Sequence, residues 1–210
     1  MYKKLVVTIL AIMMVIALTS CESKRPKEQP DSSGSEVETQ EATNASDGIE
    51  QKVYQPEDDK LFVRFTNNAG KEIDLDVCVN YICDEYEGSA FREQKYLPNG
   101  EDYIIVVEGE GTIKDYLIDY DIKEASPSVK KYFEQTPYTT EVNSLGGIDY
   151  IMQDNTEEGF NDELYIFYED TEGNILGYDE TGYGGSGEME FTFEAPGYEY
   201  DKYEIIREKM

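Results

Sequence analysis

Ile73-Asp74-Leu75-Asp76-Val77-Cys78-Val79-Asn80-Tyr81 is the stretch of sequence that decides the fold. Every odd-numbered position is apolar or aromatic, and most even-numbered positions are polar. Because successive side chains of a strand point to opposite faces, this alternation predicts a β-strand with one face in a core and the other in water.

The segments on either side of this stretch carry similar signals. Residues 61–65 repeat the apolar spacing of two and end at the turn residues 67–70, Asn-Asn-Ala-Gly. Residues 103–107 form a continuous apolar run, and residues 116–122 alternate again. Short strands separated by turn residues predict a mainly β fold.

One helical signal interrupts the strands. Ser126 is expected as the N-cap, and Pro127 fits the first turn of a helix. Val129, Tyr132 and Phe133 would share one face of that helix. The segment therefore predicts one short connecting helix.

The strand pattern occurs twice along the chain. Residues 61–125 and residues 148–209 each contain a strand, a long second strand, an acidic turn with glycine, a further glycine-bearing turn, another strand and a closing tyrosine-rich strand. The two stretches share the order and spacing of these features more than residue identity. Such a repeat indicates two copies of one unit, with about five strands in each.

A resemblance to a known family rests on three stretches: Phe65-Thr66-Asn67-Asn68, Ile166-Phe167-Tyr168-Glu169-Asp170 with Gly173, and Tyr200-Asp201-Lys202-Tyr203-Glu204-Ile205. Over residues 58–210 the chain resembles the small FxLYD-like, immunoglobulin-like modules of bacterial lipoproteins. It is similar to the tandem-module lipoproteins of clostridia-like Gram-positive bacteria, although the first copy departs from the pattern at Cys83. The resemblance implies two immunoglobulin-like β-sandwich modules in tandem and no general catalytic residues.

These signals divide the chain into five parts. We expect a leader over residues 1–20, a polar tether over residues 21–52, a first module over residues 53–125, a connector with the helix over residues 126–140, and a second module over residues 141–210. The tether is rich in Glu, Ser, Gln and Pro. It has too few apolar residues to offset the entropy cost of ordering.

The N-terminal residues have the layout of a secretion signal that ends at a cysteine. Lys3 and Lys4 precede an apolar run of about 14 residues, which is shorter than the roughly 20 residues that span a bilayer. Leu18-Thr19-Ser20-Cys21 resembles the lipobox of bacterial lipoproteins. This resemblance implies cleavage before Cys21, acylation of its thiol, and lipid anchoring outside the cytoplasm. The alternative is an uncleaved transmembrane anchor.

Composition argues against several classes of function. The chain has 46 acidic residues, 18 basic residues and no histidine, and without residues 1–20 its net charge is −30. Such a charge disfavours nucleic acid, because phosphate contacts need a basic face. The missing histidine removes histidine-based catalysis and histidine metal ligands. We therefore expect no cofactor, no nucleic-acid partner and no enzymatic activity.

Cys78 and Cys83 are expected to be free thiols. They lie five residues apart in what reads as one strand. That spacing separates them by about 16 Å, which is beyond the reach of a disulfide, about 7 Å between Cα atoms.

Acidic residues gather in several turns. Residues 154–159 have Asp and Gly at the first and sixth positions of a calcium loop, but Tyr165 stands at the twelfth, where an EF-hand has Glu. Two sets of carboxylates stay open as calcium sites: Asp154, Glu158 and Asp162, or Asp170 and Glu172. Adjacent carboxylates such as Asp179-Glu180 leave a surface hydrolase open as well, although no nucleophile motif accompanies them.

Tyrosine and glycine are concentrated in the second copy. We expect residues 177–187 to form a loop that contacts a partner, because tyrosine with glycine makes adaptable contact surfaces. The candidate contact residues are Tyr178, Tyr183, Tyr198 and Tyr200. The alternative is that these tyrosines cap the fold and the glycines only make turns.

The combined signals predict a non-enzymatic, lipid-anchored protein of the bacterial cell surface. We expect it to act as an interaction or scaffold module with a protein partner, and to contact the membrane through lipid on Cys21. The first alternative is an extracytoplasmic lipoprotein that binds a solute or calcium. A surface hydrolase is the second alternative.

Overall fold

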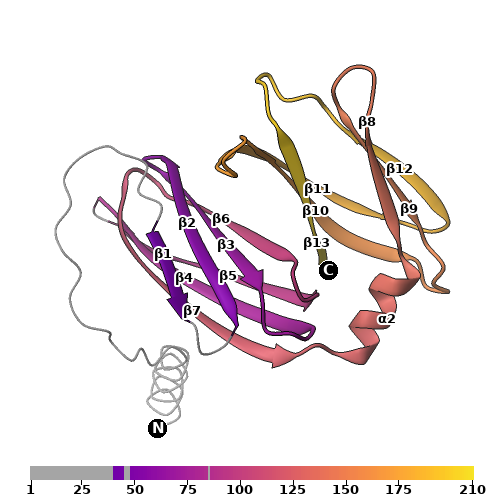
Figure 1. Cartoon of the computed structure of the whole chain (residues 1–210), viewed down its shortest axis with the longest axis horizontal. Helices are drawn as coiled ribbons and strands as arrows, with labels where there is room; N and C mark the ends of the chain where they lie inside the picture. Colours follow the sequence, from indigo (N-terminus) through magenta and orange to yellow (C-terminus); the bar gives the residue numbers. More distant parts are fainter. Residues whose placement is uncertain (1–39, 45–47, 85) are drawn as a thin grey trace, which may run out of the picture. The chain divides into compact units, whose positions relative to one another are not determined.

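The computed structural model of the chain describes residues 40–44, 48–84 and 86–210 (Figure 1). The predicted leader, Cys21 and residues 22–39 of the predicted tether lie outside these residues. Within the described ranges, no helix is both long enough and apolar enough to cross a bilayer.

Strands dominate the described residues. In chain order the elements are β1 (Gln40–Asn44), β2 (Ile49–Glu57), β3 (Lys60–Asn67), β4 (Ile73–Cys83), β5 (Tyr86–Leu97), β6 (Asp102–Glu108), β7 (Ile113–Glu124), α2 (Pro127–Gln135), β8 (Tyr138–Val142), β9 (Ile148–Gln153), β10 (Phe160–Glu169), β11 (Ile175–Gly185), β12 (Glu188–Phe193) and β13 (Lys202–Lys209). The predictions of a mainly β chain and of a short helix with Ser126 at its N-cap are confirmed.

The strands fall into two sets with the same pairing. In the first set, β2 to β7, one sheet has the order β2-β3-β6 and the other β5-β4-β7, and β1 extends the former at the β2 edge. In the second set, β8 to β13, the orders are β8-β9-β12 and β11-β10-β13. All pairs are antiparallel. Each set therefore has six strands, one more than expected, and the pairing order repeats along the chain.

Strand β4 shows why the alternating stretch folds as it does. Ile73, Leu75, Val77 and Val79 are fully buried, while the even-numbered positions between them are half-buried. The buried residues join a core to which both sheets of the first set contribute. Burial of each such side chain contributes about 1.5–3 kcal/mol, so the alternation fixes which face of β4 is inside.

The two sets pack together through one sheet of each. In β3, the side chains between the core positions are also buried: Phe62 is 1% exposed and Arg64 is 8% exposed. The ring of Phe62 meets that of Phe167, on β10, edge to face with 6.2 Å between centroids. Tyr165, Phe167 and other residues of the second set accordingly belong to the core of the first set.

The structure corrects one predicted boundary and one predicted loop. Strand β2 begins at Ile49, inside the segment predicted as a tether up to residue 52, and pairs with both β1 and β3. The apolar residues Ile49 and Val53 are too sparse among polar neighbours to stand out in the sequence, yet both are buried. Most of the predicted loop 177–187 is strand β11, and only Ser186 and Gly187 lie between β11 and β12.

Helix α2 connects the two sets and is held by a buried ion pair. The Nε of Arg207 donates to Oδ2 of Asp162 at 2.5 Å, and the hydroxyl of Tyr132 donates to Oδ1 of the same carboxylate at 2.5 Å. Arg207 also donates to the carbonyl of Thr136 at 2.7 Å, directly after the helix. The C-terminal end of α2 is thereby tied to β10 and β13.

Candidate functional site: a groove between the two strand sets

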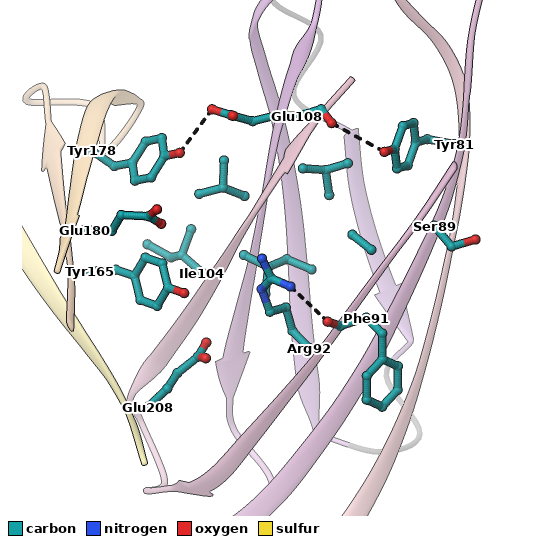
Figure 2. A pocket seen from close by; sticks show the side chains of 14 residues that line it. Tyr81, Ser89, Phe91, Arg92, Ile104, Glu108, Tyr165, Tyr178, Glu180 and Glu208 are labelled. Atoms are coloured by element: carbon teal, nitrogen blue, oxygen red, sulfur yellow. Dashed lines mark hydrogen bonds between the residues drawn. The ribbon is translucent and has the colours of Figure 1, made fainter. Parts of the chain in front are cut away.

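A groove of about 370 Å³ lies where the two strand sets meet (Figure 2). Residues of β4, β5 and β6 form its first-set wall, and residues of β10, β11 and β13 form its second-set wall. Its volume is in the range of ordinary ligand sites. Because both sets contribute, the groove exists only where they pack together.

Arg92 of β5 lies near the middle of the groove (Figure 2). Its Nη1 donates to the carbonyl of Phe91 at 3.1 Å. Within the described part of the chain, no carboxylate lies at ion-pair distance from this guanidinium. Since a guanidinium has five N–H donors, most of its hydrogen-bonding capacity is open to a ligand.

Glu108 of β6 joins the two walls at one end of the groove. Its carboxylate accepts a hydrogen bond from the hydroxyl of Tyr178 at 3.0 Å and pairs with Lys60 at 3.1 Å. Its carbonyl accepts from the hydroxyl of Tyr81 at 3.4 Å (Figure 2). The hydrogen bond from Lys60 lowers the pKa of Glu108, while burial, together with Glu108, raises the pKa of Tyr178 to about 12. The carboxylate of Glu108 is therefore an anion held by Lys60 and the hydroxyl of Tyr178, while Tyr81 binds the backbone of the same residue.

The second-set wall carries further acidic and aromatic groups. Glu180 and Glu208 both line the groove, with Tyr165 between them in Figure 2. Glu208 accepts a hydrogen bond from the hydroxyl of Tyr103 at 2.6 Å, and burial raises its pKa. The wall opposite Arg92 therefore offers two carboxyl groups to a ligand, with Tyr165 between them.

Among the described residues that line the groove, Ser89 is the one serine, and the group that accepts its hydrogen bond is not a base. Ser89 donates to Oδ1 of Asn80 at 2.6 Å, and an amide oxygen does not accept a proton at neutral pH. The groove is therefore suited to holding a ligand by hydrogen bonds, charge and aromatic contact, and its one serine is not activated as a nucleophile.

The four tyrosines predicted as partner contacts do not share one surface. Tyr178 lies in the groove, but Tyr183 is 7% exposed and belongs to the core of the second set. Tyr198 and Tyr200 pack against Tyr168, with ring centroids 6.1 and 5.0 Å away. Tyr183 is therefore a core residue and Tyr200 packs against that core, while most of the glycines lie in β11 and not in turns, so the alternative of capping tyrosines and turn glycines holds only in part.

Three of the carboxylates that the sequence left open as calcium ligands accept hydrogen bonds from other groups. Asp162 is fully buried and is held by Arg207 and Tyr132. Asp154 and Asp170 each accept hydrogen bonds from backbone N–H groups of their own turns. Over the described ranges, no group of three or more Cys, Asp or Glu side chains is arranged to hold a metal ion.

The prediction that Cys78 and Cys83 are not joined by a disulfide is confirmed. Cys78 is half-buried and Cys83 is buried, and neither forms a disulfide. Burial raises the pKa of Cys83.

The sequence did not single out Arg92 or Glu208 as site residues. Both stand in strands, among many charged residues, and only the packing of the two sets brings them to one groove. A comparison with models of protein families finds no match, and a comparison with curated proteins finds none either.

Proposed function

We propose that this chain is a non-enzymatic interaction protein with two immunoglobulin-like modules, held at the outer face of a bacterial cell membrane by lipid on Cys21, and that its groove binds a protein partner. The observation that carries the proposal is the groove itself, whose two walls come from different strand sets. A site of this kind ties ligand contact to the packing of the modules.

The strand pairing supports the immunoglobulin-like interpretation. In each set, the first, second and fifth strands form one sheet and the fourth, third and sixth form the other. This is the order in which strands A, B and E face strands C′, C and F in a sandwich with Greek-key connections. Both sheets of the first set also contribute to one core, as the two inner faces of a sandwich do.

The lipid anchor is inferred from the sequence alone. Leu18-Thr19-Ser20-Cys21 has the lipobox pattern, and the strongly negative net charge of the chain argues against attachment through a basic patch on anionic lipid. Two acyl chains on one cysteine would give stable attachment where a single chain gives marginal binding. In this proposal, residues 22–39 connect the anchor to the strands.

Cell fractionation tests the anchor. In a Gram-positive host, we expect the wild-type protein in the membrane fraction and the Cys21→Ala variant either in the culture medium or retained as uncleaved precursor. Metabolic labelling with an alkyne-bearing fatty acid should mark the wild type and leave the variant unlabelled. Equal labelling of both proteins would contradict the anchor.

Photocrosslinking tests the groove. A benzophenone side chain placed at Glu180, at the groove, should give a discrete adduct with a protein partner on intact cells. The matched control is Val142, which is 56% exposed and lies on β8, away from the groove. The same adducts from both positions, or none from Glu180, would contradict partner binding at the groove.

A further inference from the structure

We infer that the groove binds an extended peptide segment of its partner, which adds to the edge of β6 as a new strand and carries alternating acidic and basic side chains. The inference rests on the proposed binding function and names the chemistry of the ligand.

Strand β6 has a free edge. It stands at the end of its sheet and pairs only with β3 among the described strands. Five consecutive residues, Ile104 to Glu108, line the groove. An exposed strand edge is a template for strand addition, in which backbone hydrogen bonds supply affinity and side-chain pockets supply specificity.

The register shows which backbone groups of β6 face away from β3. One position beyond each end of the β3–β6 register, Gly109 donates to the carbonyl of Asp59 at 2.8 Å, and Asn67 donates to the carbonyl of Glu101 at 3.0 Å. Directly opposed residues of antiparallel strands alternate between bonded and non-bonded pairs. The bonded pairs therefore fall on the odd-numbered residues of β6.

The even-numbered residues of β6 consequently turn their N–H and C=O groups toward the groove. They include Ile104, Val106 and Glu108. One hydrogen bond confirms that the even-numbered backbone groups point this way: the carbonyl of Glu108 accepts a hydrogen bond from the hydroxyl of Tyr81 at the groove. The backbone of Ile104 and Val106 thus offers the hydrogen-bonding groups that an added strand needs.

The two walls would sort the side chains of an added strand. Successive side chains of a strand point to opposite faces, so one series would face β5 and the other would face β10, β11 and β13. Arg92 lies on the β5 side, while Glu180 and Glu208 lie on the other. A carboxylate facing Arg92 and an ammonium or guanidinium facing the glutamates would complement both walls, which requires charges that alternate with a period of two.

Two peptides of identical composition test this pattern. One is an alternating peptide of lysine and glutamate, and the other is a block peptide in which all the lysines precede all the glutamates. Both are acetylated, amidated and labelled with fluorescein, and each is titrated against the full lipidated chain in phosphatidylcholine nanodiscs, with empty nanodiscs as the control. We expect the alternating peptide to bind at least about tenfold more tightly. Only this peptide, as a strand, places all its lysines on one face and all its glutamates on the other. Equal binding, or binding of neither peptide, overturns the inference.

A matched pair of proline variants tests the backbone contact. Proline is tolerated where a strand's N–H points away from its neighbour, so Val106→Pro should fold but lose the donor at the groove. Val142→Pro is the control, because Val142 also points its N–H outward: its neighbour Asn143 bonds to Gly147 at 2.9 Å. We expect more than about a tenfold loss of affinity for the alternating peptide in the first variant and less than about twofold in the second.

Hydrogen exchange in the wild-type chain makes the test independent of variant folding. The alternating peptide should slow exchange of the Ile104 and Val106 amides and leave that of Val142 unchanged. If Glu180→Lys weakens binding while Val106→Pro and these amides show no effect, strand addition is wrong and groove binding stands. If neither substitution changes binding or crosslinking, the proposed function of the groove falls as well.

Discussion

Strands β3 and β9 hold the same place in their sets but meet different surroundings. Aligned on their pairing, Phe62 of β3 corresponds to Asp149 of β9, and Arg64 corresponds to Ile151. Phe62 and Arg64 are buried against the second set, whereas Asp149 and Ile151 are only half-buried. The first set thus has its β3 sheet covered on both faces, and the second set has the equivalent sheet covered on one.

The other pair of equivalent strands shows the reverse. Cys78 and Asn80 of β4 correspond to Tyr165 and Phe167 of β10. The residues of β4 are half-buried, while those of β10 are buried in the core of the first set. Strands covered on both faces read as continuous apolar runs, and strands covered on one face alternate. One pairing scheme therefore serves two sets that use opposite sheets for contact.

The largest effect is expected from a substitution at the centre of the contact between the two sets. Phe167→Ala removes a fully buried ring that packs on Phe62, and we expect it to lower the free energy of unfolding by about 3–5 kcal/mol. Asn80→Ala, at the equivalent place in the first set, should cost less than about 1 kcal/mol because that face is partly in water. Urea unfolding of both variants measures the difference. Equal costs would contradict the comparison.

A second prediction concerns a position where the two cores differ in polarity. Asp162 of β10 corresponds to Leu75 of β4, and both are fully buried. Asp162→Ala leaves Arg207 buried without its counter-charge, so we expect a loss of about 3 kcal/mol or more.

Replacing both members of this ion pair sharpens the test. Asp162→Leu combined with Arg207→Met should cost less than Asp162→Ala alone, because an apolar pair needs no charge compensation. Thermal unfolding of the two proteins gives the comparison. A double variant that is less stable than the single one would show that the pair does more than balance charge.

Much of the fold could be predicted from the sequence, but the contact between the sets could not. Alternation predicted β4, and the connecting helix followed from Ser126 and Pro127. At the contact, the usual relation of polarity to burial is reversed: the side chain of Glu204 on β13 is 25% exposed, while Leu117, its equivalent on β7, is 39% exposed. Charged residues in a sequence predict an exposed surface, so no local sequence pattern indicated the contact between the sets or the groove beside it.

The charged cluster at the contact predicts an unusual dependence on pH. The carboxyl of Glu204 lies 3.4 Å from Arg64, with Asp102 and Glu169 also around that guanidinium and Lys202 paired with Glu169. Burial, reinforced by Asp102, raises the pKa of Glu204 to about 8.

The sign of the effect follows from proton binding. Between the usual pKa of glutamate and about 8, the folded state holds a proton on Glu204 that the unfolded state releases. The contribution of Glu204 to stability is therefore fully present below the usual pKa of glutamate and falls as pH rises toward about 8, by up to about 4 kcal/mol between pH 5 and pH 9. Burial raises the pKa of Glu208 as well, so this carboxyl adds to the slope. Urea unfolding across this range should show a shallower slope in Glu204→Gln, and an unchanged slope would contradict this assignment.

The smallest effect is expected from two glycine substitutions, one in β11 and one in the turn after it, both within the segment predicted as a loop. Gly182 lies within β11, and no atom lies within 4 Å of a side-chain carbon added there. Gly187, in the turn that follows, has a φ of +79°. We expect Gly182→Ala to raise stability by about 0.5 kcal/mol and Gly187→Ala to lower it by about 1 kcal/mol. Thermal unfolding checks both, and the same sign for both would contradict the strand.

The central claim is that the two sets share a core and so unfold as one body. Differential scanning calorimetry of the full chain tests it most directly. We predict a single transition whose calorimetric and van't Hoff enthalpies agree, at about 0.7 kcal/mol per folded residue. Two resolved transitions, with Phe167→Ala shifting only one of them, would contradict the shared core and with it a groove that both sets build.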